Sequence, residues 1–355
     1  MSNIAKIRQA MLKESINALL LTNDTDRQYA TGFNSSYGYV LILTDGAFFI
    51  TDTRYIEVAT ERIKDAAVLA STNEKSGPVI LHDILKKADI KELGVQEKSL
   101  SYSSYLQLEK ELGVSFVPAQ KITLSLRCSK EKSEVEHMTT AQRIAEKALD
   151  HVLGLIKEGQ TEKEIAAELE YHMTRNGSEG MAFSTICVSG ENSSRPHGVP
   201  GGRRIRRGDF ITMDFGCTIN GYCSDMTRTV ALGSASDEMR RVYSTVLDAQ
   251  LAAIAALRPG VTGSSIDKVA RDIITKAGYG DYFGHGLGHS VGLDIHESPN
   301  TSPSDSSILP VGAVITSEPG IYIPGRFGVR IEDMLYLGEK GTQNLTKAPK
   351  ELIIL

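Results

Sequence analysis

The 355-residue sequence contains no tryptophan and only four cysteines, and no two of these cysteines form a CxxC pair. Paired cysteines are typical of structural zinc sites and of the disulfide frameworks of small secreted proteins, so the sequence excludes both. The thiols of Cys128, Cys187, Cys217 and Cys223 are therefore expected to be reduced, as in a cytoplasmic protein. Cys217 and Cys223 flank a predicted turn, where they fit small buried hydrophobic side chains better than metal ligands.

Long apolar segments and long runs of like charge are also missing. The first residues, MSNIAKIRQAMLKESINALLL, have charges scattered through them, so we expect neither a signal peptide nor a membrane-spanning helix. The net charge is −5, from 39 Lys and Arg against 44 Asp and Glu. Such a balance argues against a nucleic acid as a partner. A composition of 41% hydrophobic and 23% charged residues is ordinary for a globular protein.

The length of the chain suits two domains rather than one. Residues 1–125 alternate helical and strand-like segments, which predicts an α/β domain. A charged stretch, LRCSKEKSEVEHM at residues 126–138, then opens a long amphipathic helix. We therefore place the boundary there and expect a second domain over residues 126–355.

Two stretches of this second domain resemble each other at an offset of 101 residues. LIKEGQTEKEIAAELEYHMTRNG ends at Gly177, and ALRPGVTGSSIDKVARDIITKAG ends at Gly278. Each contains a glycine turn, a threonine that can cap a helix, and an amphipathic helix that stops at glycine. A shared amphipathic pattern can also arise by chance. A true duplication would give the domain two related halves with a cleft between them.

The clearest sign of a functional site is TMDFGCTINGYCSDMTRT, residues 212–229, where two aspartates interrupt apolar runs. Asn220-Gly221 predicts a two-residue hairpin turn, because both central residues of such a turn need positive φ. The turn pairs residues whose numbers sum to 441, which makes Asp214 and Asp225 diagonal neighbours on one face. Two carboxylates that close in a dry place need a cation. The alternative is an exposed hairpin whose aspartates meet water.

Three histidines follow in the glycine-rich stretch YFGHGLGHSVGLDIHESP, namely His285, His289 and His296. The helical two-histidine zinc motif needs both residues on one helical face, and this many glycines make a poor helix. The glycines instead allow a backbone that brings imidazoles close to another group.

Further carboxylates interrupt apolar runs near the end of the chain. Glu318 precedes a Pro-Gly turn in VITSEPGIYI, and GVRIEDMLYL places Arg330 and Glu332 two residues apart, so we expect both on one strand face. Arg330 could simply neutralise Glu332. Together, two Asp, two Glu and one His form an oxygen-rich ligand set that favours manganese or cobalt, with zinc possible. Two ions bridged by carboxylates can activate a water near neutral pH, which indicates a hydrolase.

Five motifs occur in order: MDFG, SDMTRT, GHGLGH followed by GLDIHE, SEPGIY and GVRIED. Together they resemble the pita-bread metallopeptidases, in particular the Xaa-Pro aminopeptidases and the Xaa-Pro dipeptidases, or prolidases. Residues 1–125 resemble the creatinase-type N-terminal domain of that family. The expected fold class is therefore α/β (α+β), with a pita-bread catalytic domain over residues 126–355 that has a pseudo-two-fold internal duplication.

The resemblance implies a site for two divalent metal ions, with manganese favoured. Its implied ligands are Asp214, Asp225, His289, Glu318 and Glu332. Glu318 would also carry a proton toward the leaving prolyl nitrogen. His197 and His296 would donate hydrogen bonds to the tetrahedral oxyanion, or would merely orient ligands. His285 and Arg330 match positions beside the substrate, where the arginine also steadies the Glu332 strand.

The substrates implied by the resemblance are proline-containing peptides. A dipeptide presents its terminal carboxylate beside proline, so a dipeptidase should offer a cation there, and prolidases often carry an arginine after the HE motif. Residues 297–310, ESPNTSPSDSSILP, contain no Lys or Arg, which favours an Xaa-Pro aminopeptidase over the alternative, a prolidase. Arg54, Arg326 or a partner subunit could still supply the charge. TGFNSSYG at residues 31–38 resembles a loop that reaches a neighbouring active site, so we expect a homodimer.

Three rival interpretations fit the residues less well. Methionine aminopeptidases normally lack an N-terminal domain such as residues 1–125. Creatinase-like amidinohydrolases work without metals and lack the full ligand set. A peptide-binding relative without catalysis would have no reason to keep a costly carboxylate cluster.

Overall fold

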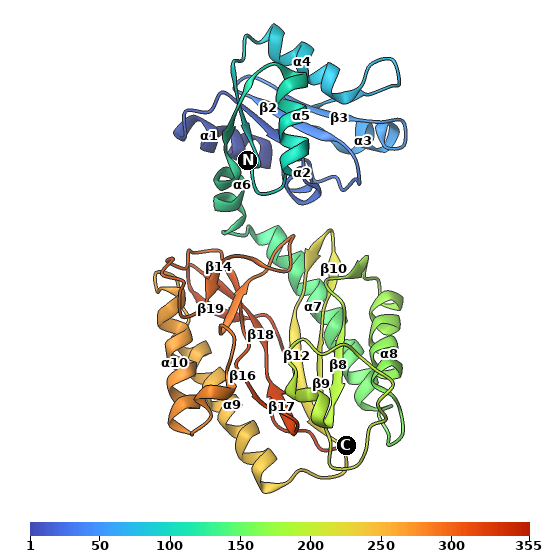
Figure 1. Cartoon of the computed structure of the whole chain (residues 1–355), viewed down its shortest axis with the longest axis vertical. Helices are drawn as coiled ribbons and strands as arrows, with labels where there is room; N and C mark the ends of the chain where they lie inside the picture. Colours follow the sequence, from blue (N-terminus) through green and yellow to red (C-terminus); the bar gives the residue numbers. More distant parts are fainter. The chain divides into compact units, whose positions relative to one another are not determined.

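The computed structural model describes residues 1–355 and divides into two compact units, residues 1–127 and 128–355 (Figure 1). The boundary predicted from the sequence, after residue 125, lies two residues from this division. All four cysteines are free thiols. None of the helices has the length and apolar character needed to cross a membrane.

The first unit is built on a six-stranded mixed sheet with the order β4-β3-β2-β1-β5-β6. Its strands are β1 (Ala18–Leu21), β2 (Tyr39–Leu43), β3 (Ala47–Thr51), β4 (Ala67–Ala70), β5 (Glu92–Val95) and β6 (Ser115–Pro118). Its helices are α1 (Asn3–Lys13), α2 (Asp24–Thr31), α3 (Ile56–Arg62), α4 (Gly77–Lys87), α5 (Tyr102–Leu112) and α6 (Gln120–Arg127). β2 is antiparallel to its neighbours β1 and β3, and the other pairs are parallel. β1 is buried at every residue, which is typical of a continuous apolar strand covered on both faces.

The second unit contains two halves, each with a pair of helices packed on strands. The first half contains α7 (Lys132–Leu153), α8 (Glu162–Arg175), β7 (Gly180–Met181), β8 (Ile186–Ser189), η1 (Gly190–Ser194), β9 (Phe210–Phe215), β10 (Cys217–Ile219), β11 (Tyr222–Cys223) and β12 (Met226–Ala231). The second half contains α9 (Asp237–Ala256), α10 (Gly263–Lys276), η2 (Gly280–Tyr282), β13 (Gly288–Ser290), β14 (Glu297–Thr301), β15 (Val314–Ser317), β16 (Gly320–Ile323), β17 (Phe327–Arg330), β18 (Asp333–Gly338) and β19 (Gly341–Asn344). Figure 1 shows the strands of both halves between the two helix pairs.

Four sheets run through these halves. Their strand orders are β11-β10-β7, β12-β9-β8, β14-β13-β15-β18-β19 and β16-β17. One hydrophobic core lies between α7, α8 and the β9 and β12 strands. A second core lies between α9, α10 and the strands of the second half. The helices therefore cover the outer faces and leave the inner strand faces free to form a site.

The predicted duplication is visible in the backbone. α8 and α10 are both 14 residues long and begin 101 residues apart, at Glu162 and Gly263. Each is capped by a threonine side chain, Thr161 or Thr262. The glycine turns before them have matching φ values of 90° and 88°. Because glycine alone adopts such angles without strain, the same turn chemistry sets up the same helix twice.

The hairpin at Asn220-Gly221 has the predicted register. The two turn residues have φ values of 48° and 76°. Every pair between β10 and β11, and between β9 and β12, has residue numbers that sum to 441. The side chains of Asp214 and Asp225 are only 13% and 6% exposed, so the alternative of an exposed hairpin is wrong.

The expectation that Arg330 and Glu332 share one strand is wrong. β17 ends at Arg330 and β18 begins at Asp333; β17 pairs with β16, whereas β18 pairs with β15 and β19. Glu332 lies between the strands because its backbone bonds elsewhere: its N–H donates to the carbonyl of Thr227, and its carbonyl accepts from Arg228. The chain therefore changes sheets at the predicted metal ligand.

Candidate metal centre

A cavity of about 630 Å³ lies between the two halves of the second unit. It is lined by all nine residues to which the sequence assigns a role: His197, Asp214, Asp225, His285, His289, His296, Glu318, Arg330 and Glu332. Its size is in the range of ligand sites in enzymes. These residues are spread along the sequence between positions 197 and 332, and the fold brings them to one cavity.

Strands position the five candidate ligands. Asp214 lies on β9 and His289 on β13, while Asp225 and Glu332 immediately precede β12 and β18. Glu318 immediately follows β15. Strand hydrogen bonding holds the backbone of Asp214 and His289 directly, whereas the other three ligands lie one residue outside a strand.

The ligand atoms of Asp225, His289 and Glu332 all lie within 4.8 Å of one another. Two buried carboxylate oxygens, Oδ1 of Asp214 and Oε1 of Glu332, have no hydrogen-bond partner in the protein. A buried polar atom without a partner is costly, and a divalent cation is the partner that a converging set of carboxylates and one imidazole fits. The residues present therefore fit bound metal.

Burial and like charge strain the cluster electrostatically when no cation is bound. Burial and the charge of Asp214 hold the pKa of Asp225 well above its usual range. Burial and the charge of Asp225 do the same for the pKa of Glu332. Neighbouring carboxylates whose pKa values are raised in this way are stable as anions only when a positive charge lies beside them.

His289 and Glu318 form an ion pair inside this cluster, with 3.3 Å between Nε2 and Oε1. Burial alone would lower the pKa of His289, but the hydrogen bond and charge of Glu318 outweigh it and raise the pKa to about 9. Burial alone would raise the pKa of Glu318, but its bond to His289 lowers the pKa to about 2. The metal-free cluster therefore keeps a proton on the imidazole.

Arg330 does not neutralise Glu332, as one interpretation of the sequence allowed. Its Nη2 is 2.6 Å from Oδ2 of Asp214, and its Nη1 donates to the hydroxyl of Tyr322 over 2.7 Å. The same hydroxyl lies 3.0 Å from Nε2 of His285. The arginine therefore holds Asp214 and, through Tyr322, reaches an imidazole whose pKa is lowered by burial. Sequence reasoning missed Tyr322.

Two threonines that the sequence analysis missed also orient ligands. The Thr227 hydroxyl donates to Oε2 of Glu332 over 2.7 Å. The Thr316 hydroxyl donates to Oε1 of Glu318 over 3.2 Å and accepts from the backbone N–H of His289 over 3.0 Å. Thr227 follows Asp225 by two residues and Thr316 precedes Glu318 by two, so strand alternation was the available signal.

The other two histidines assigned to catalysis lie at the exposed side of the cavity. His296 packs edge-on against His289, with 4.4 Å between ring centroids. Burial and the charge of His289 lower the pKa of His296, which favours the neutral ring. His197 is exposed in the loop after η1 and lines the same cavity. Both rings can reach a ligand that enters.

The sequence pattern of metallopeptidase family M24 matches residues 136–339, and that of the creatinase/prolidase N-terminal domain matches residues 3–129. The chain is 39% identical to an Xaa-Pro dipeptidase of Pyrococcus furiosus, over 99% of each chain. A solved structure of an Xaa-Pro dipeptidase from Bacillus anthracis has a TM-score of 0.94 at 40% identity, over 99% of each chain. An X-Pro aminopeptidase from Thermotoga maritima has a TM-score of 0.92 at 37% identity, over 98% of this chain and 100% of that one.

These matches confirm the predicted fold class, α/β (α+β) with a creatinase-type N-terminal domain and a pita-bread domain. They also agree with the cavity, whose carboxylates and imidazole fit divalent metal ions. The chain belongs to metallopeptidase family M24 and is a hydrolase that depends on divalent metal ions.

Proposed function

We propose that the protein is an Xaa-Pro aminopeptidase, which hydrolyses the bond before proline at the N-terminus of peptides. The names of relatives that match nearly the whole chain support the choice of an Xaa-Pro bond. The lining of the cavity supports the choice of an aminopeptidase. A homodimer, expected from the loop at residues 31–38, stays a prediction.

Two divalent ions, with manganese favoured and cobalt or zinc as alternatives, fit the donor set better than one. Five ligands, four of them carboxylates able to bridge, are more than a single ion needs at a site that must also admit substrate. The proposed ligands are Asp214, Asp225, His289, Glu318 and Glu332. When bound, the ions polarise the scissile carbonyl and make water nucleophilic near neutral pH.

The protein's own groups supply the remaining steps of the proposed reaction. Glu318 accepts a proton at its carboxylate and returns it to the prolyl nitrogen as the bond breaks. His197 and His296 face the cavity, where their ring N–H groups donate to the developing oxyanion. Arg330 holds Asp214 in place through their 2.6 Å contact, and its charge opposes the rise that burial causes in the pKa of Asp214.

The observation that favours an aminopeptidase is the lack of an available fixed cation in the cavity wall. The wall contains no lysine, and its one arginine, Arg330, is already bound to Asp214 and Tyr322. Arg326, another candidate, pairs with Glu238. A dipeptide's terminal carboxylate would therefore be desolvated without a partner, whereas a longer peptide has a neutral amide at that point.

An Xaa-Pro dipeptidase is the second candidate. It is favoured by the relatives themselves, because the chain is 39% identical to one Xaa-Pro dipeptidase and 40% identical to another. In that case a ring N–H group, such as that of His197 or His296, would have to bind the terminal carboxylate in place of the missing cation.

The two candidates differ in one assay. Manganese-loaded protein is given an Xaa-Pro dipeptide and a tripeptide with proline second, each with and without a chelator. We expect chelator-sensitive cleavage of the tripeptide at a kcat/KM equal to or above that of the dipeptide. Cleavage of the dipeptide alone would make the protein a prolidase, and cleavage of neither would remove the proposed function.

Adding a cation to the cavity wall should shift the preference toward dipeptides. Asn300 lines the cavity four residues after His296 and lies opposite His289 on the neighbouring strand. In Asn300→Arg, a bond to the terminal carboxylate is expected to raise the dipeptide-to-tripeptide ratio of kcat/KM by about 10-fold or more, since bonds to charged groups contribute about 1.5–3 kcal/mol. Asn300→Gln is the uncharged control. An equal ratio in both variants would place the carboxylate elsewhere.

A further inference from the structure

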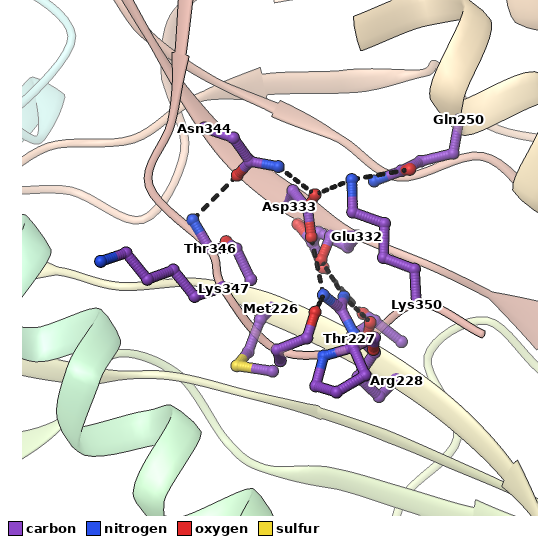
Figure 2. A network of polar contacts seen from close by, with 12 residues as sticks. Met226, Thr227, Arg228, Gln250, Glu332, Asp333, Asn344, Thr346, Lys347 and Lys350 are labelled. Carbon is purple, nitrogen blue, oxygen red and sulfur yellow. Dashed lines mark hydrogen bonds and ion pairs between the residues drawn. The ribbon is translucent and has the colours of Figure 1, made fainter. Parts of the chain in front are cut away.

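Arg228 is a buried residue, next to a site threonine, to which no role has yet been assigned. Only 2% of it is exposed, and all five N–H groups of its guanidinium are in use. Nε donates to the Pro349 carbonyl (2.7 Å), Nη1 to the carbonyls of Thr227 (2.9 Å) and Glu332 (2.6 Å), and Nη2 to the Asp333 carboxylate (2.8 Å) and the Ala348 carbonyl (2.8 Å). Figure 2 shows Thr227, Glu332 and Asp333 around the guanidinium.

These bonds fix the backbone of Glu332 at both ends. Its N–H donates to the Thr227 carbonyl over 3.1 Å, and its own carbonyl accepts from Arg228. Its carboxylate accepts from the Thr227 hydroxyl at Oε2, which leaves Oε1 for the cluster with Asp225 and His289. Glu332 belongs to neither β17 nor β18, so no sheet hydrogen bonding would hold it otherwise.

We propose that Arg228 is a positioning residue for the metal ligand Glu332. The inference rests on the proposed metal centre and goes beyond it, because Arg228 does not line the cavity and none of its five hydrogen bonds goes to a ligand side chain. The guanidinium of Arg228, a residue of β12, hydrogen-bonds both to the carbonyl of Glu332 and to the backbone carbonyls of residues 348–349. A lysine in its place keeps the charge beside Asp333 but has three donors on a flexible stem, and it cannot reproduce a planar set of five bonds.

Lys350, which also pairs with the Asp333 carboxylate, provides a matched control for this role. Oδ1 of Asp333 accepts from Arg228, while Oδ2 of Asp333 pairs with Lys350 and accepts from Asn344 (Figure 2). Arg228 and Lys350 therefore both offset the same buried carboxylate, but only Arg228 also binds the Glu332 carbonyl. Lys350→Met removes one cation from Asp333 without removing a bond to the ligand.

The test is metal binding rather than turnover. Chelator-stripped wild type, Arg228→Lys and Lys350→Met are titrated with Mn²⁺ by calorimetry, and the visible absorption of their Co²⁺ forms is recorded. We expect a dissociation constant about 10–100-fold higher and an altered Co²⁺ spectrum in Arg228→Lys, as for other residues that orient ligands. Lys350→Met should keep the wild-type Co²⁺ spectrum and bind Mn²⁺ with a dissociation constant within about threefold of that of wild type. We expect this difference between the two variants even if both have the same lowered Tm.

Equal affinities and spectra in Arg228→Lys and wild type would overturn the inference, and so would equal losses in both variants. If Arg228→Lys does not fold, Arg228→Met replaces it, because Lys350 still pairs with the Asp333 carboxylate and no buried charge is left without a partner. The same loss of Mn²⁺ affinity is expected there. A wild-type protein that binds no Mn²⁺ would instead overturn the metal centre, and with it the role of Arg228.

Discussion

Asp225→Asn is expected to abolish peptide hydrolysis and, at the same time, to stabilise the metal-free protein. The loss follows from removing one ligand of the proposed centre. The gain follows because burial and the neighbouring charge of Asp214 raise the pKa of Asp225, so that its ionised form opposes folding. Asparagine has nearly the same shape and carries no charge. A purely structural carboxylate would give the opposite change in stability.

The gain in stability should grow with pH. An acid whose pKa is raised by folding binds its proton more tightly in the folded state, so metal-free wild type loses stability as pH rises from the unfolded pKa through the folded one. Asparagine does not titrate, and the two proteins therefore separate as pH rises. Each 1 kcal/mol of difference corresponds to about 2–4 °C in Tm for a unit of this size.

The measurement is thermal unfolding of chelator-stripped wild type and Asp225→Asn at several pH values up to 8, with a turnover assay on the manganese-loaded forms. Asp281→Asn changes an exposed carboxylate on η2 and serves as the control, with turnover and Tm like those of wild type. A lower Tm for Asp225→Asn at pH 8, or measurable turnover above a few per cent, would contradict the assignment of Asp225 as a ligand.

The parts of the fold that could be read from the sequence are those set by local rules. Asn220-Gly221 determines a turn, and strand alternation then determines which face carries Asp214 and Asp225. The glycine and threonine signals around α8 and α10 are likewise local, and they repeat at one offset. The ligand set followed from five motifs, which resemble those of the pita-bread metallopeptidases and occur in the same order along the chain.

The parts that could not be read from the sequence depend on contacts between distant segments. The Thr227 hydroxyl and the Glu332 carboxylate are 105 positions apart, and Arg330 reaches Asp214 across 116. Two residues spaced like Arg330 and Glu332 suggest one strand face, but the bonds to β12 draw Glu332 out of the sheet. Local periodicity contains no signal for such a change of partner, because tertiary hydrogen bonds decide it.

Manganese is expected to bind about 100-fold more tightly at pH 8 than at pH 6, because binding must displace a proton. In the metal-free protein, Nε2 of His289 lies 3.3 Å from Glu318 and 3.7 Å from Asp225. Those carboxylates raise the pKa of the imidazole to about 9, despite its burial. A ligand imidazole must be neutral, so below pH 9 each unit of pH should change the dissociation constant about tenfold per proton released.

The raised pKa values of Asp225 and Glu332 act in the same direction and can only steepen this dependence. Calorimetric titration with Mn²⁺ at pH 6, 7 and 8, in pairs of buffers with different ionisation enthalpies, gives both the affinity and the number of protons released. Lys350→Met, outside the cluster, should show the wild-type slope. An affinity that stays constant over this range, with no effect of buffer, would mean that the cluster is already deprotonated before metal arrives. The carboxylates would then be balanced by something other than the proton on His289.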